Sequence, residues 1–280
     1  MTQEIASLTD IAGNYDALVF DQWGVLHNGS TPYGAAVSTL EHLSRAGHRL
    51  AVLSNSGKRA APNAARIATF GFDQTWFNEV MTSGEALWRD IAAGHIPHRN
   101  LYAVERTPGD ALAWAQGLSI NLVERLDQAE AILLMGLPDG TELADWHPFI
   151  AQAAAANMPV YCSNPDRASP RAGGQLVVSP GELAYRLRDA GTPVTFYGKP
   201  HPAIFKALQS ALNASRLLIV GDSLEHDIAG GCQAGWDTVL VQGGLYAVPF
   251  ATDSPARTVL SALAAEKSAP LPTYMIKDVR

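Results

Sequence analysis

The chain has 280 residues, 47% of them hydrophobic and 17% charged, so it can bury one large core or a core and a smaller second domain. A net charge of −7 with no cluster of Lys and Arg argues against nucleic-acid binding, which needs basic side chains to neutralise phosphates. No apolar run approaches the roughly 18 residues of a membrane span, and two cysteines are too few for a disulfide framework. We therefore expect a cytoplasmic protein that binds neither nucleic acid nor membrane.

The first predicted strand, Ala17 to Phe20, ends on Asp21. A short continuous apolar run is typical of a strand buried on both faces, and open α/β sheets bind their ligands at the carboxyl ends of such strands. An Asp followed by a glycine turn is also ordinary turn chemistry. Asp21 becomes a candidate functional residue only when it is considered together with the polar residues that follow later strands.

A helix over Ala35 to Ala46 and a strand over Arg49 to Leu53 are predicted next. The strand runs into Ser54-Asn55-Ser56-Gly57, and a helix opens near Lys58. Free backbone N–H groups at a helix start can bind an anion, with a hydroxyl as a further donor. Ordinary N-capping by Ser or Asn explains the same residues equally well.

A third strand ends near Thr82, and the pattern then changes. Between Ser54 and Lys199 lies far more chain than the roughly 30 residues of a βαβ crossover, which indicates an inserted second α/β unit. Its predicted strands are Leu101 to Val104, Ile120 to Val123, Ala131 to Met135, Val160 to Cys162 and Leu176 to Val178, with helices over Ala111 to Gln116 and Trp146 to Ala156.

The core is expected to resume with a strand over Val194 to Tyr197, so that Lys199 follows a core strand. A further strand, Arg216 to Val220, runs into GDSLEHD, which brings Asp222 and Asp227 to the same edge. The remaining core elements are predicted as helices over Pro202 to Leu212 and Ala256 to Ala265 and strands over Thr238 to Val241 and Tyr274 to Ile276.

Three carboxylates, a lysine and a hydroxyl thus reach one edge of the predicted sheet: Asp21, Asp222, Asp227, Lys199 and Ser54. Carboxylate oxygens suit Mg²⁺, which takes a substrate phosphate as a further ligand. A carboxylate beside the phosphorus can attack it and form an aspartyl-phosphate. The constellation predicts Mg²⁺-dependent chemistry on a phosphate ester.

Four motifs, FDQWGVL, LSNS, YGKPHP and GDSLEHDIAGG, resemble those of the haloacid dehalogenase-like (HAD) superfamily. Within it the chain is similar to the subfamily IIA hydrolases, the NagD-like and p-nitrophenyl phosphatase-like proteins. The resemblance implies a Rossmann-like, doubly wound parallel-sheet core over residues 1–83 and 188–280. It also implies an inserted α/β cap domain over residues 84–187.

The resemblance implies roles for the motif residues. Asp21 is implied as the nucleophile, Ser54 with Asn55 as the phosphate-binding group, and Lys199 as the lysine that steadies both nucleophile and phosphate. The Mg²⁺ ligands implied are Asp21, Asp222, Asp227 and the backbone carbonyl of Trp23.

The SNPDR segment of the cap resembles a loop that reaches toward the substrate, which makes Asn164 and Asp166 candidate specificity residues. A plain Asn-Pro-Asp turn is the alternative. Related proteins often pair through their caps, so the resemblance also allows a homodimer.

Trp23 departs from the family pattern, in which a second Asp two residues after the nucleophile protonates the leaving oxygen. An indole does not exchange a proton near pH 7, and general acid–base catalysis contributes typically about 10² to 10⁴-fold. We therefore expect a phosphatase restricted to leaving groups that need little protonation, such as those of aryl or acyl phosphates.

Three alternatives stay open at this stage. His27 is the nearest titratable substitute for the missing acid, or else an exposed loop histidine. A phospholigand-binding protein with little or no turnover is the second. A dehalogenase is the third, suggested by the aromatic at position 23 and opposed by the two metal carboxylates.

Overall fold

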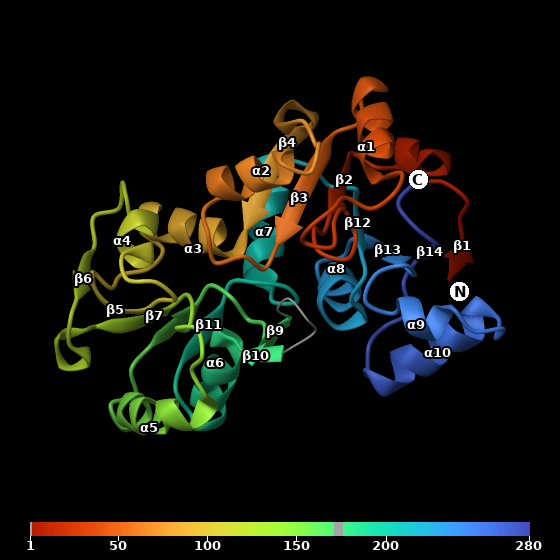
Figure 1. Cartoon of the computed structure of the whole chain (residues 1–280). Helices are drawn as coiled ribbons and strands as arrows, with labels where there is room; N and C mark the ends of the chain where they lie inside the picture. Colours follow the sequence, from red (N-terminus) through yellow and green to blue (C-terminus); the bar gives the residue numbers. More distant parts are fainter. Residues whose placement is uncertain (1, 171–175) are drawn as a thin grey trace. The chain divides into compact units, whose positions relative to one another are not determined.

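The computed structural model describes residues 2–170 and 176–280, which divide into two compact units (Figure 1). The first unit runs to Ser54, resumes over Ala61–Met81 and ends with Lys199–Arg280. The second unit comprises Asn55–Ala60 and, within the described ranges, Thr82–Gly198. The first unit is thus assembled from segments far apart in the sequence.

The seven-stranded sheet of the first unit is built around β2, which lies between β12 and β3. Its strands, in spatial order, are β1 (Gln3–Glu4), β14 (Tyr274–Ile276), β13 (Asp237–Val241), β12 (Leu217–Gly221), β2 (Ala17–Phe20), β3 (Leu50–Ser54) and β4 (Phe77–Thr82). The pairings from β1 to β3 in this order are parallel. All four residues of β2 are buried, as expected for a central parallel strand.

The helices of the first unit alternate with these strands, which confirms the predicted Rossmann-like α/β class. They are α1 (Ala36–Arg45), α2 (Ala60–Ala68), α7 (Pro202–Leu212), α8 (Ala229–Gln233), α9 (Ala247–Phe250) and α10 (Ala256–Glu266). Leu40 and Leu43 of α1 are buried in the same apolar cluster as Leu18 and Phe20. Burial of that helix face holds α1 against the sheet.

The second unit has its own five-stranded parallel sheet and its own apolar core. The strands, in spatial order, are β11 (Val194–Phe196), β8 (Val160–Cys162), β7 (Ala131–Leu134), β5 (Asn100–Val104) and β6 (Asn121–Val123), all paired in parallel. An antiparallel pair, β9 (Ala168–Pro170) and β10 (Leu176–Val178), stands apart from this sheet. The helices are α3 (Ser83–Ala92), α4 (Asp110–Trp114), α5 (His147–Ala155) and α6 (Pro180–Asp189).

The expected return of Val194 to Tyr197 to the core sheet was wrong. Strand β11 pairs with β8, so it belongs to the sheet of the second unit, and residues 188–198 lie in that unit. An apolar strand pattern shows that a segment is buried between neighbours but carries no information on which sheet supplies them. Lys199 therefore begins the segment that returns to the first unit, and does not follow one of its strands.

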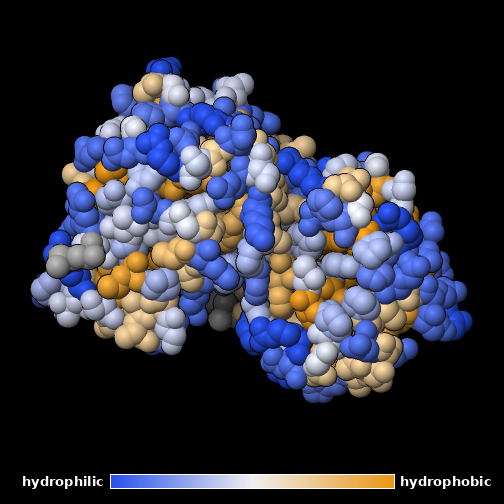
Figure 2. Space-filling model, turned by 180° about the vertical axis from the view of Figure 1, so that it is seen from behind, coloured by the Kyte–Doolittle hydropathy of each residue, from blue (hydrophilic) through white to orange (hydrophobic). Residues whose placement is uncertain are grey.

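Hydrophilic residues are spread over the face in Figure 2, with hydrophobic residues in scattered groups. Among the described residues, the large hydrophobic side chains that are exposed are Trp23, Leu112, Leu245, Val248 and Leu271. None of the described helices has the length and apolar character needed to cross a bilayer.

Candidate active site

Asp21 and Asp222 follow neighbouring strands of the core sheet. Phe20, the last residue of β2, is in register with Val220 of β12, and the Asp21 N–H donates to the Val220 carbonyl at 3.0 Å. Because the strands run in parallel, both carboxylates emerge at the same edge. The sequence-based expectation for their shared position therefore agrees with the geometry.

The carboxylate of Asp222 accepts a backbone hydrogen bond from one loop and lies close to the backbone of another. The N–H of Leu245 donates to its Oδ2 at 2.8 Å. Gly24 has φ +86°, and a Cβ at this position would lie 1.7 Å from the same oxygen. Only glycine combines this backbone conformation with so close an approach.

Asp227 lies in a π-helical turn, Leu224–Ile228, directly after β12. Its Oδ2 accepts the Ser223 N–H at 3.0 Å, and the side chain is 1% exposed. Such single-turn π segments occur frequently at functional sites. One carboxylate oxygen each from Asp21, Asp222 and Asp227 can be chosen so that all three lie within 4.8 Å of one another.

Lys199 links two of these carboxylates. Its Nζ donates to Asp21 Oδ1 and to Asp227 Oδ1, both at 2.6 Å, and the side chain is 3% exposed. Burial disfavours the charged ammonium, but Asp21 and Asp227 outweigh this effect and raise the pKa of Lys199. The lysine is therefore charged at neutral pH and fixes the position of Asp21 Oδ1.

The three carboxylates carry more negative charge than Lys199 balances. Burial raises the pKa of Asp21 to about 6, against the opposing effect of Lys199 and with a further contribution from Asp227. Burial, followed by repulsion from Asp21 and Asp227, raises the pKa of Asp222 well above its usual value. A divalent cation would offset this repulsion, and carboxylate oxygens are the ligands that Mg²⁺ prefers. The donor set fits Mg²⁺.

The indole of Trp23 is packed on its own loop. A Cβ on Gly29 would lie 2.2 Å from the ring, and the ring meets the imidazole of His27 edge-on with centroids 6.1 Å apart. The residue is 48% exposed. Its backbone is held by a bridge to His27, so the main-chain position does not depend on the indole.

His27 is buried, at 2% exposure, so the interpretation as an exposed loop histidine was wrong. Its Nδ1 accepts the Gly29 N–H at 3.1 Å, and its ring lies 4.3 Å from that of Phe70. Burial, aided by Arg66, lowers the pKa of His27 to about 4. A buried, neutral imidazole is poorly suited to replace a carboxylic acid as proton donor.

The other predicted residues follow β3. Ser54 ends this strand in the first unit, and Asn55 begins the segment Asn55–Ala60 of the second unit, which we call the 55–60 loop. Asn55 Nδ2 donates to Asp166 Oδ1 at 2.8 Å, and the Asp166 N–H donates to Asn164 Oδ1 at 3.0 Å. Asn164 thus closes an Asx turn, as its alternative interpretation supposed, while Asp166 contacts the loop.

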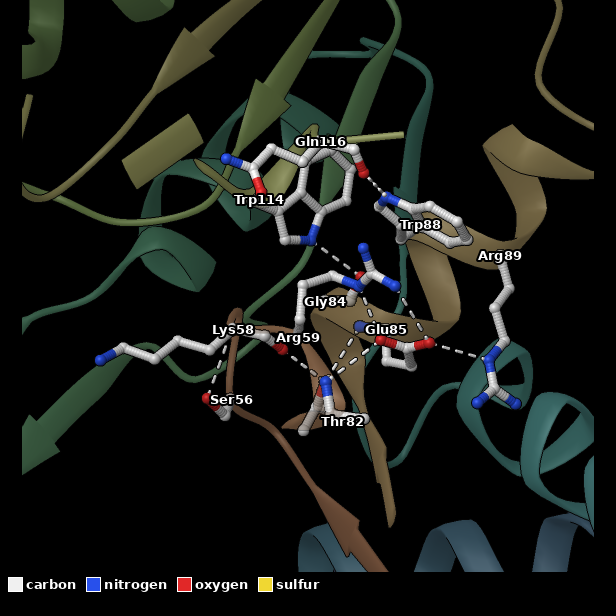
Figure 3. Close-up of polar contacts among 11 residues, drawn as sticks. Ser56, Lys58, Arg59, Thr82, Gly84, Glu85, Trp88, Arg89, Trp114 and Gln116 are labelled. Atoms are coloured by element: carbon white, nitrogen blue, oxygen red, sulfur yellow. Dashed lines mark hydrogen bonds and ion pairs between the residues drawn. The ribbon is translucent and has the colours of Figure 1, made fainter. Parts of the chain in front are cut away.

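Sequence reasoning missed Glu85, which binds the 55–60 loop. Thr82-Ser83-Gly84-Glu85 has the S/T-x-x-E pattern of a capping box, and this pattern was the available signal. Thr82 does cap α3, with its Oγ1 accepting the Glu85 N–H at 2.9 Å. Two contacts of the Glu85 carboxylate, with Arg59 and with the Ala60 N–H, join residues 26 and 25 positions away, which no local pattern could reveal. Figure 3 shows the pairing with Arg59.

Two family models match the chain. The model of haloacid dehalogenase-like hydrolases matches residues 18–116, and a second model, of HAD-hydrolase-like proteins, matches residues 196–279. Together they span the segments that carry the acid cluster and Lys199.

Among characterised proteins, human chronophin is 28% identical over 263 residues, covering 86% of this chain and 85% of its own. D-glycerol 3-phosphate phosphatase of Mycobacterium tuberculosis is 28% identical over 243 residues, covering 85% of this chain and 66% of its own.

Solved structures show the same architecture. A haloacid dehalogenase-like hydrolase from Brucella suis superimposes with a TM-score of 0.79 at 25% identity, covering 99% of this chain and 100% of that one. The glycerol phosphate phosphatase of M. tuberculosis in complex with magnesium gives a TM-score of 0.71 at 26% identity, covering 98% and 78%.

Proposed function

Because this chain belongs to the haloacid dehalogenase-like hydrolases, in the NagD-like subfamily IIA, we propose that it is a Mg²⁺-dependent phosphatase acting on a small phosphate ester through Asp21. Relatives named as phosphatases and the magnesium-bound structure of one of them support the activity and the cofactor. The single observation that carries the proposal is the buried cluster in which Lys199 bridges Asp21 and Asp227 beside Asp222.

In the proposed reaction, a carboxylate oxygen of Asp21 attacks the phosphorus while the bond from phosphorus to the ester oxygen breaks, and the leaving group departs as a phenolate or carboxylate, with any proton it needs taken from solvent afterwards. Water then attacks the phosphorylated Asp21, which restores the carboxylate and releases inorganic phosphate. Lys199 orients Asp21 through Oδ1 and contributes a positive charge beside the phosphoryl oxygens.

The residues that would hold Mg²⁺ are Asp21, Asp222 and Asp227, whose carboxylate oxygens lie close together. The backbone carbonyl of Trp23 is proposed as a further ligand on the family resemblance alone. When bound, the ion supplies positive charge that offsets the charges of the carboxylates and of the substrate phosphoryl group. Ser54 and Asn55 are proposed to bind the remaining phosphoryl oxygens.

We further propose that Trp23 restricts the substrate range. The indole at this position lies against Gly29 and His27 and offers no titratable group. Leaving groups of low pKa depart without help from an acid, whereas alkoxides need one. The proposed substrates are therefore aryl or acyl phosphates.

The second unit is proposed to act as the cap that selects the substrate, with Asn164 and Asp166 as its specificity candidates; Asn164 Oδ1 closes its own turn, and Asp166 Oδ1 accepts from Asn55 Nδ2. Pairing of two copies through this unit stays a prediction.

The test compares Mg²⁺-dependent hydrolysis of p-nitrophenyl phosphate with that of an alkyl phosphate, for the native protein and for Asp21→Asn. We expect turnover of the aryl ester alone, lost in Asp21→Asn. Turnover of both esters at similar rates would refute the restriction by Trp23. Stabilisation by phosphate esters without any turnover would favour the phospholigand-binding alternative, to which the indole at position 23 points.

A further inference from the structure

Glu85 is a buried carboxylate outside the acid cluster. It lies in the first turn of α3, and its side chain is 7% exposed. Burial alone would raise its pKa, but the hydrogen bonds from Arg59, the Ala60 N–H and Arg89 outweigh burial and lower it. Glu85 is therefore charged at neutral pH, and its partners hold that charge in place.

Two of its three partners belong to the 55–60 loop (Figure 3). Oε2 accepts Arg59 Nε at 2.7 Å and the Ala60 N–H at 3.1 Å. Oε1 accepts Arg89 Nε at 3.0 Å, from the next turn of α3. One carboxylate thus connects the end of the loop, at the start of α2, to the first two turns of α3.

The loop backbone is held by the same helix start. The Gly84 N–H donates to the Ser56 carbonyl at 3.1 Å, and Thr82 Oγ1 donates to the Lys58 carbonyl. A Cβ on Gly84 would lie 2.0 Å from the Gly57 carbonyl oxygen, so only glycine allows this approach. The loop backbone is therefore in direct contact with the start of α3 along most of its length.

Arg59 is held a second time, by an aromatic side chain. Its guanidinium carbon lies 3.7 Å from the centre of the Trp88 ring, and Trp88 Nε1 donates to the Gln116 carbonyl at 3.2 Å. Trp114 Nε1 donates to the Gly84 carbonyl at 3.0 Å. The guanidinium is thus fixed between a carboxylate and an indole, both anchored in the second unit.

We propose that Glu85 is a positioning residue for phosphate binding, acting through Arg59 and the Ala60 N–H to fix the 55–60 loop. The inference rests on the proposed function, in which Ser54 and Asn55 hold the phosphoryl group. Backbone donors bind an anion tightly only when their geometry is set beforehand. The Glu85 pairing also holds the Arg59 guanidinium over the Trp88 ring.

Arg89 provides a matched control. Its Nε donates to the same carboxylate from within α3, but Arg89 is not part of the contacts that Glu85 makes with Arg59 and the Ala60 N–H. The variants are Glu85→Gln, Arg59→Ala and Arg89→Ala. The measurements are the inhibition constant of inorganic phosphate and the KM and kcat for p-nitrophenyl phosphate with Mg²⁺, alongside urea unfolding of each variant.

Misplaced binding groups cost up to about 100-fold, so we expect Glu85→Gln and Arg59→Ala to raise the phosphate inhibition constant and KM about 10- to 100-fold, with a smaller change in kcat. Arg89→Ala should lower stability and leave both constants unchanged. Equal phosphate inhibition constants for Arg59→Ala and Arg89→Ala would overturn the proposal. This comparison does not need Glu85→Gln, so it stands even if that variant does not fold. A native protein that hydrolyses no ester would instead refute the proposed function, and calorimetry with inorganic phosphate would then compare the variants directly.

Discussion

Replacing Trp23 by Asp places a carboxylic acid two residues after Asp21. The backbone at this position is held by the bridge to His27 and by the Gly24 N–H, which donates to the His27 carbonyl at 3.0 Å, so the main chain should not move. The Trp23 indole is half exposed and lies against Gly29. An Asp side chain is smaller than the indole and therefore fits into the same space. Trp23→Asp should therefore accelerate hydrolysis of alkyl phosphates.

The expected size follows from two opposing effects. General acid–base catalysis supplies about 10² to 10⁴-fold, and a side chain without tuned partners should reach the lower end, about 100-fold or about 2.7 kcal/mol of barrier. Loss of the half-buried indole removes roughly 100 Å² of apolar contact, which should lower the unfolding free energy by about 2 to 3 kcal/mol. A domain of ordinary stability, about 5 to 15 kcal/mol, tolerates this loss.

The assay is kcat/KM for an alkyl phosphate at pH 5 to 8 with Mg²⁺. Trp23→Asn is the matched control, because it removes the indole equally but carries no titratable proton. Acceleration by Asp and not by Asn is expected. Equal rates for the two variants would refute the reasoning that a missing acid limits the native protein.

Three further predictions concern the groups around the cluster. Gly24→Ala should abolish the stabilisation by Mg²⁺ in thermal unfolding, because the new Cβ would displace the Asp222 carboxylate. Gly47→Ala is the control: it has a similar φ of +84° but open space around it, so it should lower stability through backbone strain and keep the response to Mg²⁺. Lys199→Met leaves the buried Asp227 and the largely buried Asp21 without their cation and should lower the unfolding free energy by about 3 to 5 kcal/mol in EDTA and by less with Mg²⁺; equal losses in both would contradict a metal in the cluster. Because the folded pKa of Glu85 is lowered, its stabilising effect is full above its ordinary pKa of about 4.5 and is lost as the pH falls through the folded value. The difference in urea stability between native protein and Glu85→Gln should accordingly be largest near neutral pH and shrink in acid; a constant difference would show that the charge is not responsible.

Most core elements could be predicted from the sequence, because apolar runs and helical spacing reflect burial directly. Strands β2, β8, β10 and β14 and helix α7 have the predicted ends, and most others differ by one residue. Helices α3, α6 and α9 and the short strands β1 and β9 were not predicted. The short edge strands leave only a weak periodic signal.

The sequence by itself determined the residue types of the candidate site and their order, since each stands at the end of an apolar run or in a long motif. Only the tertiary structure decided that Lys199 returns from the second unit to bridge Asp21 and Asp227, because the sheet that a strand joins depends on its neighbours. The same holds for the buried state of His27 and for the link from Glu85 to Arg59. Such contacts join residues that are distant in the chain, so they stabilise the protein only after folding has brought those residues together.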